Sequence, residues 1–147
     1  MNKSTRVGAA LLILAAAAAA QLTASRGEIT VIVENFRTDA GQARFALYRS
    51  EDGFPDEPAK AYKSAVVDVV DYKARTTFTD LPYGTYAVYV LHDENSNGYL
   101  DRNFFKVPTE GYGASNNAAG IMEMPVFDEA KVLLRSKQLT LRVDIQY

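Results

Sequence analysis

The sequence predicts an all-β fold, an antiparallel β-sandwich of seven to eight strands. Two observations support this class: apolar residues recur with a period of two, and short strand-like segments alternate with turn residues. The last segment, residues 139–147, shows the period clearly, because Leu139 and Leu141 alternate with Thr140 and Arg142. Several short strands separated by turns are typical of a sandwich.

Six further segments have the composition of strands. They are rich in β-branched and aromatic residues and span residues 28–36, 43–50, 65–72, 75–81, 85–93 and 130–135. Between two of them, Pro82 and Gly84 indicate a turn, and Tyr86 is placed to fold back and bond the backbone at this corner. The connection 51–63 is predicted to be a surface crossover with a helical turn. The connection 107–130 is longer, and long loops in compact domains tend to be functional.

The N-terminal segment has the pattern of a secretory signal peptide. Lys3 and Arg6 precede an apolar run over residues 7–20, which is followed by small and polar residues. This run is shorter than the roughly 20 residues that a membrane-spanning helix needs. We therefore expect the segment to be removed rather than to anchor the protein.

Cleavage after Ala20 or Ala24 satisfies the preference for small residues at the cut site. Residues 1–24 are thus interpreted as a signal peptide, and residues 25–147 as one β-sandwich domain that is periplasmic or secreted, without a membrane span. Removal of the leader takes the formal net charge from −2 to −4 and leaves no basic patch, which argues against a nucleic-acid partner. Because the chain has no cysteine, disulfides, thiolate metal sites and cysteine nucleophiles are excluded.

The stretch HDENSNGYLD, residues 92–101, has the ligand spacing of a calcium loop. The predicted ligands are the side chains of Asp93, Asn95, Asn97 and Asp101 and the backbone carbonyl of Tyr99. Gly98, at the sixth place, permits the sharp reversal that brings alternate side chains to one point. Phe104 stands at the twelfth place, where an EF-hand has a bidentate glutamate, so Glu94 or Glu110 would have to substitute.

The same stretch has a simpler interpretation as a β-hairpin. Asn97 and Gly98 form the strongest short turn signal, and asparagine and aspartate side chains bond their own backbone in turns. This interpretation does not require oxygen-bearing side chains at positions 93, 95 and 101 as well, which favours a cation.

Further polar residues are candidates for the wall of the same site. His92 is the only histidine and is more typical of a hydrogen-bonded structural residue than of a catalyst. In the long loop, EGYGASNN is either a glycine-rich turn or a part of the site. The candidates for this wall are His92, Glu94, Glu110, Ser115, Asn116 and Asn117.

Three motifs in order, HDENSNGYLDRN, PTEGYGASNNAAG and PVFDEAKV, follow LPYGTYAVYVLHD. Together they resemble the bacterial family called domain of unknown function 2141, over most of the mature chain. The resemblance implies an exported domain of prealbumin-like or immunoglobulin-like β-sandwich type, without an established activity. The acidic loop also resembles calcium loops in β-sandwich repeats of bacterial surface adhesins.

The sequence therefore favours an exported binding or structural module rather than an enzyme. We expect it to hold Ca²⁺ weakly and to bind a polar ligand or protein partner whose identity the sequence does not give. A hydrolase that uses carboxylates and His92 is the alternative, and it would need these groups to line one pocket. A small outer-membrane β-barrel is a weaker hypothesis, because residues 28–36 and 85–93 are apolar on both faces.

Overall fold

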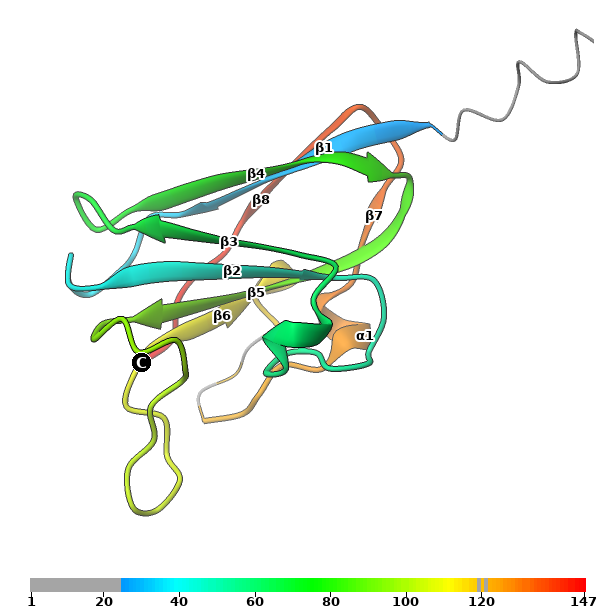
Figure 1. The fold of residues 1–147 in the computed structure, drawn as a ribbon. Helices are drawn as coiled ribbons and strands as arrows, with labels where there is room; N and C mark the ends of the chain where they lie inside the picture. Colours follow the sequence, from blue (N-terminus) through cyan, green and yellow to red (C-terminus); the bar gives the residue numbers. More distant parts are fainter. Residues whose placement is uncertain (1–24, 119, 121) are drawn as a thin grey trace, which may run out of the picture.

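A computed structural model describes residues 25–118, 120 and 122–147. The predicted signal peptide, residues 1–24, lies outside the described residues. Two β-sheets, of three and five strands, pack face to face around one main core (Figure 1). The predicted all-β sandwich of about eight strands is confirmed.

The smaller sheet has the strand order β4-β1-β8. It consists of β1 (Arg26–Val33), β4 (Ala74–Pro82) and β8 (Gln138–Arg142). The central strand β1 pairs antiparallel with β4 and parallel with β8. Thus the last strand joins the sheet beside the first one.

The larger sheet has the order β3-β2-β5-β6, and β7 pairs with the first residues of β5. Its strands are β2 (Gln42–Tyr48), β3 (Lys63–Asp68), β5 (Gly84–Asp93), β6 (Tyr112–Ala114) and β7 (Val132–Leu134). All seven predicted strands are present, with shifted ends, whereas β6 was not predicted. The acidic stretch follows directly from β5, the longest strand of this sheet.

The two long connections carry the short helices. The crossover after β2 contains the 3-10 helix η1 (Pro58–Lys60), which is the helical turn predicted for this connection. The connection after β6 contains η2 (Ser115–Asn117) and α1 (Phe127–Ala130). Within the described residues, no helix is long and apolar enough to cross a membrane.

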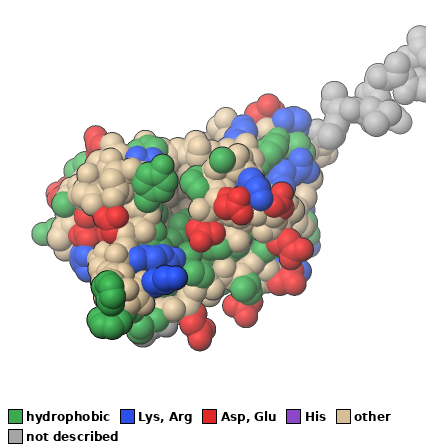
Figure 2. Space-filling view, turned by 60° about the horizontal axis from the view of Figure 1, so that its bottom comes forward, with side chains coloured by type: hydrophobic (Ala, Val, Ile, Leu, Met, Phe, Trp, Pro, Cys, Tyr) green, Lys and Arg blue, Asp and Glu red, His purple; other side chains and the backbone are tan. Residues whose placement is uncertain are grey.

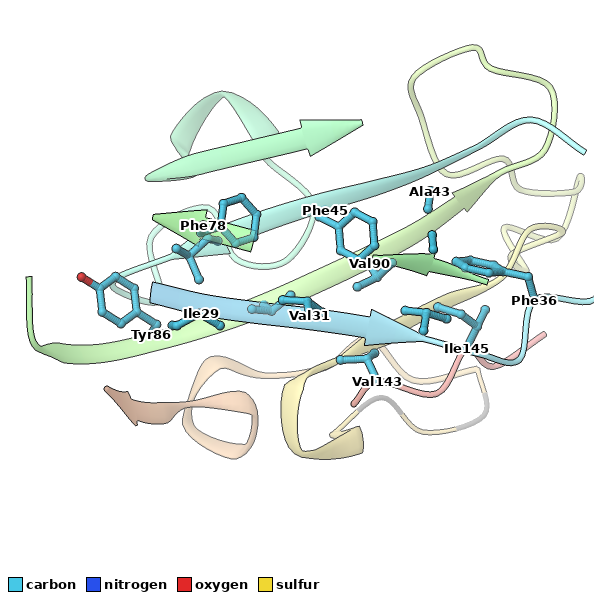
Figure 3. Close-up of a cluster of buried hydrophobic side chains, with 14 of the residues drawn as sticks. Ile29, Val31, Phe36, Ala43, Phe45, Phe78, Tyr86, Val90, Val143 and Ile145 are labelled. Atoms are coloured by element: carbon cyan, nitrogen blue, oxygen red, sulfur yellow. The ribbon is translucent and has the colours of Figure 1, made fainter. Parts of the chain in front are cut away.

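The core is built from the inward-facing side chains of both sheets. Figure 3 shows members from β1, β2, β4 and β5, among them Ile29, Phe45, Phe78 and Val90. Each large apolar side chain that is buried contributes about 1.5–3 kcal/mol to folding. Because the chain lacks cysteine, this burial takes the place of disulfides.

The strand β5 is buried on both faces. Its inner face joins the main core, and its outer face joins a second cluster that includes Tyr48, Tyr89 and Tyr112. The connections after β2 and β6 cover this outer cluster with Phe54 and Met124. Covered on both sides, β5 provides a fixed base for the loop that follows it.

Tyr86 forms the predicted corner between β4 and β5. The residue is fully buried, and its hydroxyl donates a hydrogen bond of 2.6 Å to the carbonyl of Pro82. Figure 3 shows this hydroxyl at the border of the core. The predicted structural role of Tyr86 is confirmed.

The predicted strand 139–147 is shared between the two sheets. Beyond β8, the amide of Val143 still donates to the carbonyl of Ile32, at 3.0 Å. The chain then turns to the other sheet, where Gln146 and Tyr112 exchange two backbone hydrogen bonds of 2.8 and 3.0 Å. The C-terminal segment 143–147 therefore links the sheets.

Candidate functional site

The acidic loop, residues 94–101, begins where β5 ends, at one end of the sandwich. Its first residues pack on the turn before β2, where Gly41 has a φ of +68°. A Cβ atom at Gly41 would lie 2.0 Å from the carbonyl oxygen of Asp93. Only glycine allows this close approach. The backbone of Gly41 therefore packs directly against the backbone at the start of the loop.

Asp93 is fully buried, and its carboxylate is bonded to the protein on both oxygens. Oδ1 accepts the amide of Asn97 at 3.0 Å, and Oδ2 accepts the amide of Gly98 at 2.8 Å. The Nε of Arg44, on β2, also donates to Oδ2 at 2.5 Å. A buried carboxylate needs such partners, and here they hold the sharp turn of the loop in place.

The other predicted ligand side chains meet at Asp101. Its Oδ2 accepts the amide nitrogen of Asn95 at 2.5 Å, and its Oδ1 accepts that of Asn97 at 2.8 Å. The two amide oxygens accept backbone amides instead, from Asn97 at 3.1 Å and from Tyr99 at 2.9 Å. The loop thus combines the convergence expected of a cation site with the side-chain bonds expected of a turn.

Glu110 fastens both ends of the loop. Its side chain is buried, and its two oxygens accept the amides of Glu94 at 2.8 Å and of Asp101 at 3.0 Å. This residue was predicted as a substitute for the missing twelfth ligand. It reaches the loop as expected, but it bonds the backbone amides rather than the side chains that meet at Asp101.

Glu94, the other candidate substitute, faces a different partner. Its carboxylate accepts hydrogen bonds from Arg37 and, at 3.0 Å, from the hydroxyl of Thr38. The hydrogen bond from Arg37 lowers the pKa of Glu94 below its ordinary value, against the opposing effect of burial. Arg37 also donates to the carbonyl of Thr109, at 3.0 Å, so the pair connects three segments.

His92 lies under the loop with both ring nitrogens bonded. It is fully buried, with Nε2 2.9 Å from the carbonyl oxygen of Ala40 and Nδ1 2.7 Å from the hydroxyl of Tyr147. A carbonyl can only accept, so Nε2 donates the hydrogen bond to Ala40. The ring is therefore fixed and its nitrogens are already engaged.

The structure does not bring Ser115, Asn116 and Asn117 to the acidic loop. The strand β6 runs antiparallel to β5, away from the loop, and the hydroxyl of Ser115 accepts the amide of Val88 at 2.9 Å. Val88 lies five positions before the end of β5 at Asp93, a distance of about 16 Å along a strand. Of the two interpretations left open for EGYGASNN, a wall of the site does not hold for these three residues, because β6 runs away from the loop and the sequence does not show this pairing direction.

Ser115, Asn116 and Asn117 instead fasten the connection after β6. The hydroxyl of Ser115 donates to the carbonyl of Ala130 at 2.5 Å. Asn116 donates to the carbonyl of Lys131 at 2.9 Å, and Asn117 accepts the amide of Asp144 at 3.0 Å. The side chains of these three residues therefore satisfy backbone groups outside regular strands and stabilise the connection.

The oxygen set of the loop decides which ion it suits. Among the described residues, no three His, Cys, Asp or Glu side chains form a group that could hold a metal ion. A cation would therefore depend on Asp101, on the amide oxygens of Asn95 and Asn97, and on backbone carbonyls. These are hard oxygen donors with little charge, which suits calcium rather than a transition metal.

Arg37 and Arg44 were not foreseen from the sequence, although both hold acids of the loop. Arg44, one of two arginines in the largely apolar segment 43–50, was the available signal, since a charge among apolar residues usually needs a partner. Its partner in the structure is Asp93, 49 positions along the chain. Figure 2 shows acidic, basic and hydrophobic side chains close together on one face of the molecule.

The comparison with known families agrees with the order of motifs around this loop. Residues 31–142 match the family described as uncharacterized protein conserved in bacteria, DUF2141. The chain belongs to this family. The matched region contains the acidic loop, both of its arginine partners and Glu110. No curated protein and no solved structure matches the chain.

Proposed function

We propose that the protein is an exported, non-enzymatic binding module that holds a calcium ion weakly at its acidic loop. One observation carries the proposal: the side chains of Asn95 and Asn97 converge on the carboxylate of Asp101. Calcium takes six to eight oxygen ligands in flexible geometry, from carboxylates, amides and backbone carbonyls. The loop offers all three kinds.

Asp101 would be the charged ligand of the ion. A half-turn of the Asn95 and Asn97 amides exchanges their nitrogens for oxygens, and the carbonyl of Tyr99 adds a backbone ligand. Asp93 stays bonded to Arg44 and to the backbone, so it shapes the loop. The ion would supply structural charge compensation rather than catalysis.

The affinity should be low. Turning the two amides gives up their bonds to the backbone amides of Asn97 and Tyr99, and few of the ligands are charged. We therefore expect a dissociation constant of about 10⁻⁴–10⁻³ M, as in extracellular calcium modules. Such an affinity is useful only where calcium is plentiful, which agrees with the proposed export.

The absence of catalysis is part of the proposal, and it has two supports. Both nitrogens of His92 are engaged by Ala40 and Tyr147. The buried acids Asp93 and Glu110 bind backbone amides. A polar ligand or a protein partner at this end of the sandwich would complete the role of the module.

Thermal unfolding in calcium tests the metal site. At a calcium concentration ten times the dissociation constant, the free energy of unfolding should rise by about 1.4 kcal/mol, relative to sodium chloride of equal ionic strength. Asp101→Ala should abolish this difference. Asp128→Ala removes an exposed carboxylate of α1 that pairs with Lys131, and this variant should keep the stabilisation by calcium.

Magnesium provides a second control, because it demands a tighter octahedral geometry and keeps its water. It should stabilise the protein less than calcium does. Equal unfolding temperatures in calcium and sodium chloride, with no heat of calcium binding by titration calorimetry, would contradict the proposal. The loop would then be a turn held by its own side chains.

A further inference from the structure

A hollow lies beside the acidic loop on the outer face of the larger sheet. Its volume is about 150 Å³. The floor is formed by outward-facing residues of three strands, Arg44, Ala46, Val66, Tyr89 and Leu91. The walls are the crossover around Pro55 and residues 98–100 of the acidic loop. Hydrophobic side chains occupy the hollowed middle of the face that Figure 2 shows.

Tyr89 is one of the floor residues and carries an unsatisfied group. The residue is 6% exposed, and its buried hydroxyl has no hydrogen-bond partner among the described residues. Most buried polar groups in proteins are bonded. On the same strand, Tyr86 follows this rule through Pro82. The hydroxyl of Tyr89 is therefore an unused donor on a side chain that lines the hollow.

Arg44 supplies a second set of available donors. Its Nε is bonded to Asp93, whereas its two terminal nitrogens bond no acceptor in the part of the chain that the structure describes. They lie near Gly98, where a Cβ atom would be 3.6 Å from Nη2. A guanidinium edge of this kind is suited to binding a carboxylate through two parallel hydrogen bonds.

The remaining lining residues limit the ligand. Pro55, Val66 and Leu91 provide apolar surface, and a cavity of about 150 Å³ is large enough for a benzene-sized group. Asp56 also lines the hollow and disfavours a second negative charge. The ligand therefore needs a small apolar body and only one carboxylate.

We propose that this hollow binds a small organic monocarboxylate, whose charge is recognised by Arg44 and whose apolar body lies against Tyr89. The hydroxyl of Tyr89 donates a hydrogen bond to the bound molecule. The proposal does not depend on calcium, because Arg44 and Tyr89 hold their positions through β2 and β5. The hollow shares with the acidic loop the wall 98–100 and Arg44, whose Nε is bonded to Asp93.

Benzoate is the probe, with a titration of the ¹⁵N-labelled protein followed by NMR. Calcium-free buffer without chelator is used, because chelators are themselves carboxylates. Benzoate should cause saturable shifts in amides of Arg44, Ala46 and Gly98. Benzyl alcohol, which lacks the charge, should bind about tenfold more weakly or worse, and terephthalate, with two charges, should bind more weakly than benzoate.

Four variants locate the binding. Tyr89→Phe should weaken benzoate binding about two- to tenfold without destabilising the free protein, since the hydroxyl has no partner to lose. Val66→Trp fills the hollow from a side chain that is 50% exposed and should abolish binding. Val70→Trp, on an exposed residue outside the hollow, is its matched control and should bind normally. Arg44→Lys keeps a cation for Asp93 but loses the guanidinium edge, so its affinity should fall at least about tenfold.

The outcomes separate this proposal from the calcium site. Saturable benzoate binding that Val66→Trp removes supports the hollow, whatever calcium does. The proposal is overturned if benzoate does not bind, if benzyl alcohol binds equally well, or if Val66→Trp or Tyr89→Phe leaves the affinity unchanged. If Arg44→Lys fails to fold, the benzoate affinities of Val66→Trp and Tyr89→Phe still test the proposal.

Discussion

Two tyrosines on β5 show how single hydroxyl groups differ in what they contribute. Tyr86 points into the main core and bonds Pro82, whereas Tyr89 lies on the opposite face without a partner in the described residues. An unmade hydrogen bond costs about 1–3 kcal/mol when the partner stays buried. The two positions therefore respond differently to the same substitution.

Tyr86→Phe should lower the free energy of unfolding by about 1–3 kcal/mol, because the carbonyl of Pro82 loses its donor. Tyr89→Phe is the matched control and should leave the stability equal or higher. Urea denaturation of both variants provides the measurement. Equal stability of Tyr86→Phe and the wild type would show that the hydroxyl is not needed at this corner.

A pH effect is expected at Tyr48. Its hydroxyl donates to the carbonyl of Pro55, and burial raises its pKa to about 12. A raised folded-state pKa contributes stability that is complete below the unfolded value of about 10 and is lost as the pH rises towards 12. Tyr48→Phe should therefore lose less stability than the wild type between about pH 10 and 12. Denaturation at both pH values measures this, and equal losses would contradict it.

Residue spacing predicted which side chains of the acidic loop lie together and missed the arginines that bond its acids. It placed Asn95, Asn97 and Asp101 in one cluster, because a short loop with a glycine brings alternate side chains together. It could not supply Arg37 or Arg44, whose partners lie far along the chain. Such pairs depend on strand register, which a local pattern does not contain.

Among the elements, alternation predicted the last strand, because it reports one buried face, and β-branched and aromatic composition predicted the other six. Both missed β6, which has only three residues and a glycine at its centre. A Cβ atom at Gly113 would lie 2.4 Å from the carbonyl oxygen of Asp144, so close packing by the C-terminal segment requires this residue. Alternation also did not show that 139–147 changes sheets. The apolar side chains of this segment point into the same core before and after the change, so the alternation continues without a break.

The acidic loop is joined to the segment after β1 through Arg37 and Glu94. Hydrogen bonding by Arg37 lowers the pKa of Glu94, so the ionised form stabilises the fold. This stability is present above the unfolded pKa of about 4.3 and is lost as the pH falls through the lower folded value. Because Arg37 is 44% exposed, the pair should contribute no more than about 1 kcal/mol.

Glu94→Gln should therefore be less stable than the wild type at pH 7 by up to about 1 kcal/mol, and the difference should disappear in acid. Urea denaturation at several pH values gives both quantities. Glu129→Gln, on an exposed residue of α1, should match the wild type throughout. A difference for Glu94→Gln that stays constant from neutral to acid pH would exclude the ionised pair as its cause.

At the scale of the whole molecule, the sheets are joined by the core and by the C-terminal segment 143–147. Ile145 lies in the core, and Asn35 holds its backbone through two hydrogen bonds of 3.0 and 3.1 Å. Tyr147 completes the link by accepting the amide of Arg37 and bonding His92. One short segment thus connects the first strand, the last strand and the base of the acidic loop.

Ile145→Ala should destabilise the whole sandwich by about 2–5 kcal/mol, because it leaves a cavity where the two sheets meet. Leu133→Ala is the matched control: this side chain is 57% exposed on β7, so its loss should cost about 0.5 kcal/mol or less. Denaturation followed by both far-ultraviolet circular dichroism and tyrosine fluorescence should give one coincident transition for Ile145→Ala, at lower denaturant. Two separate transitions would show that the sheets unfold independently and that the C-terminal segment does not couple them.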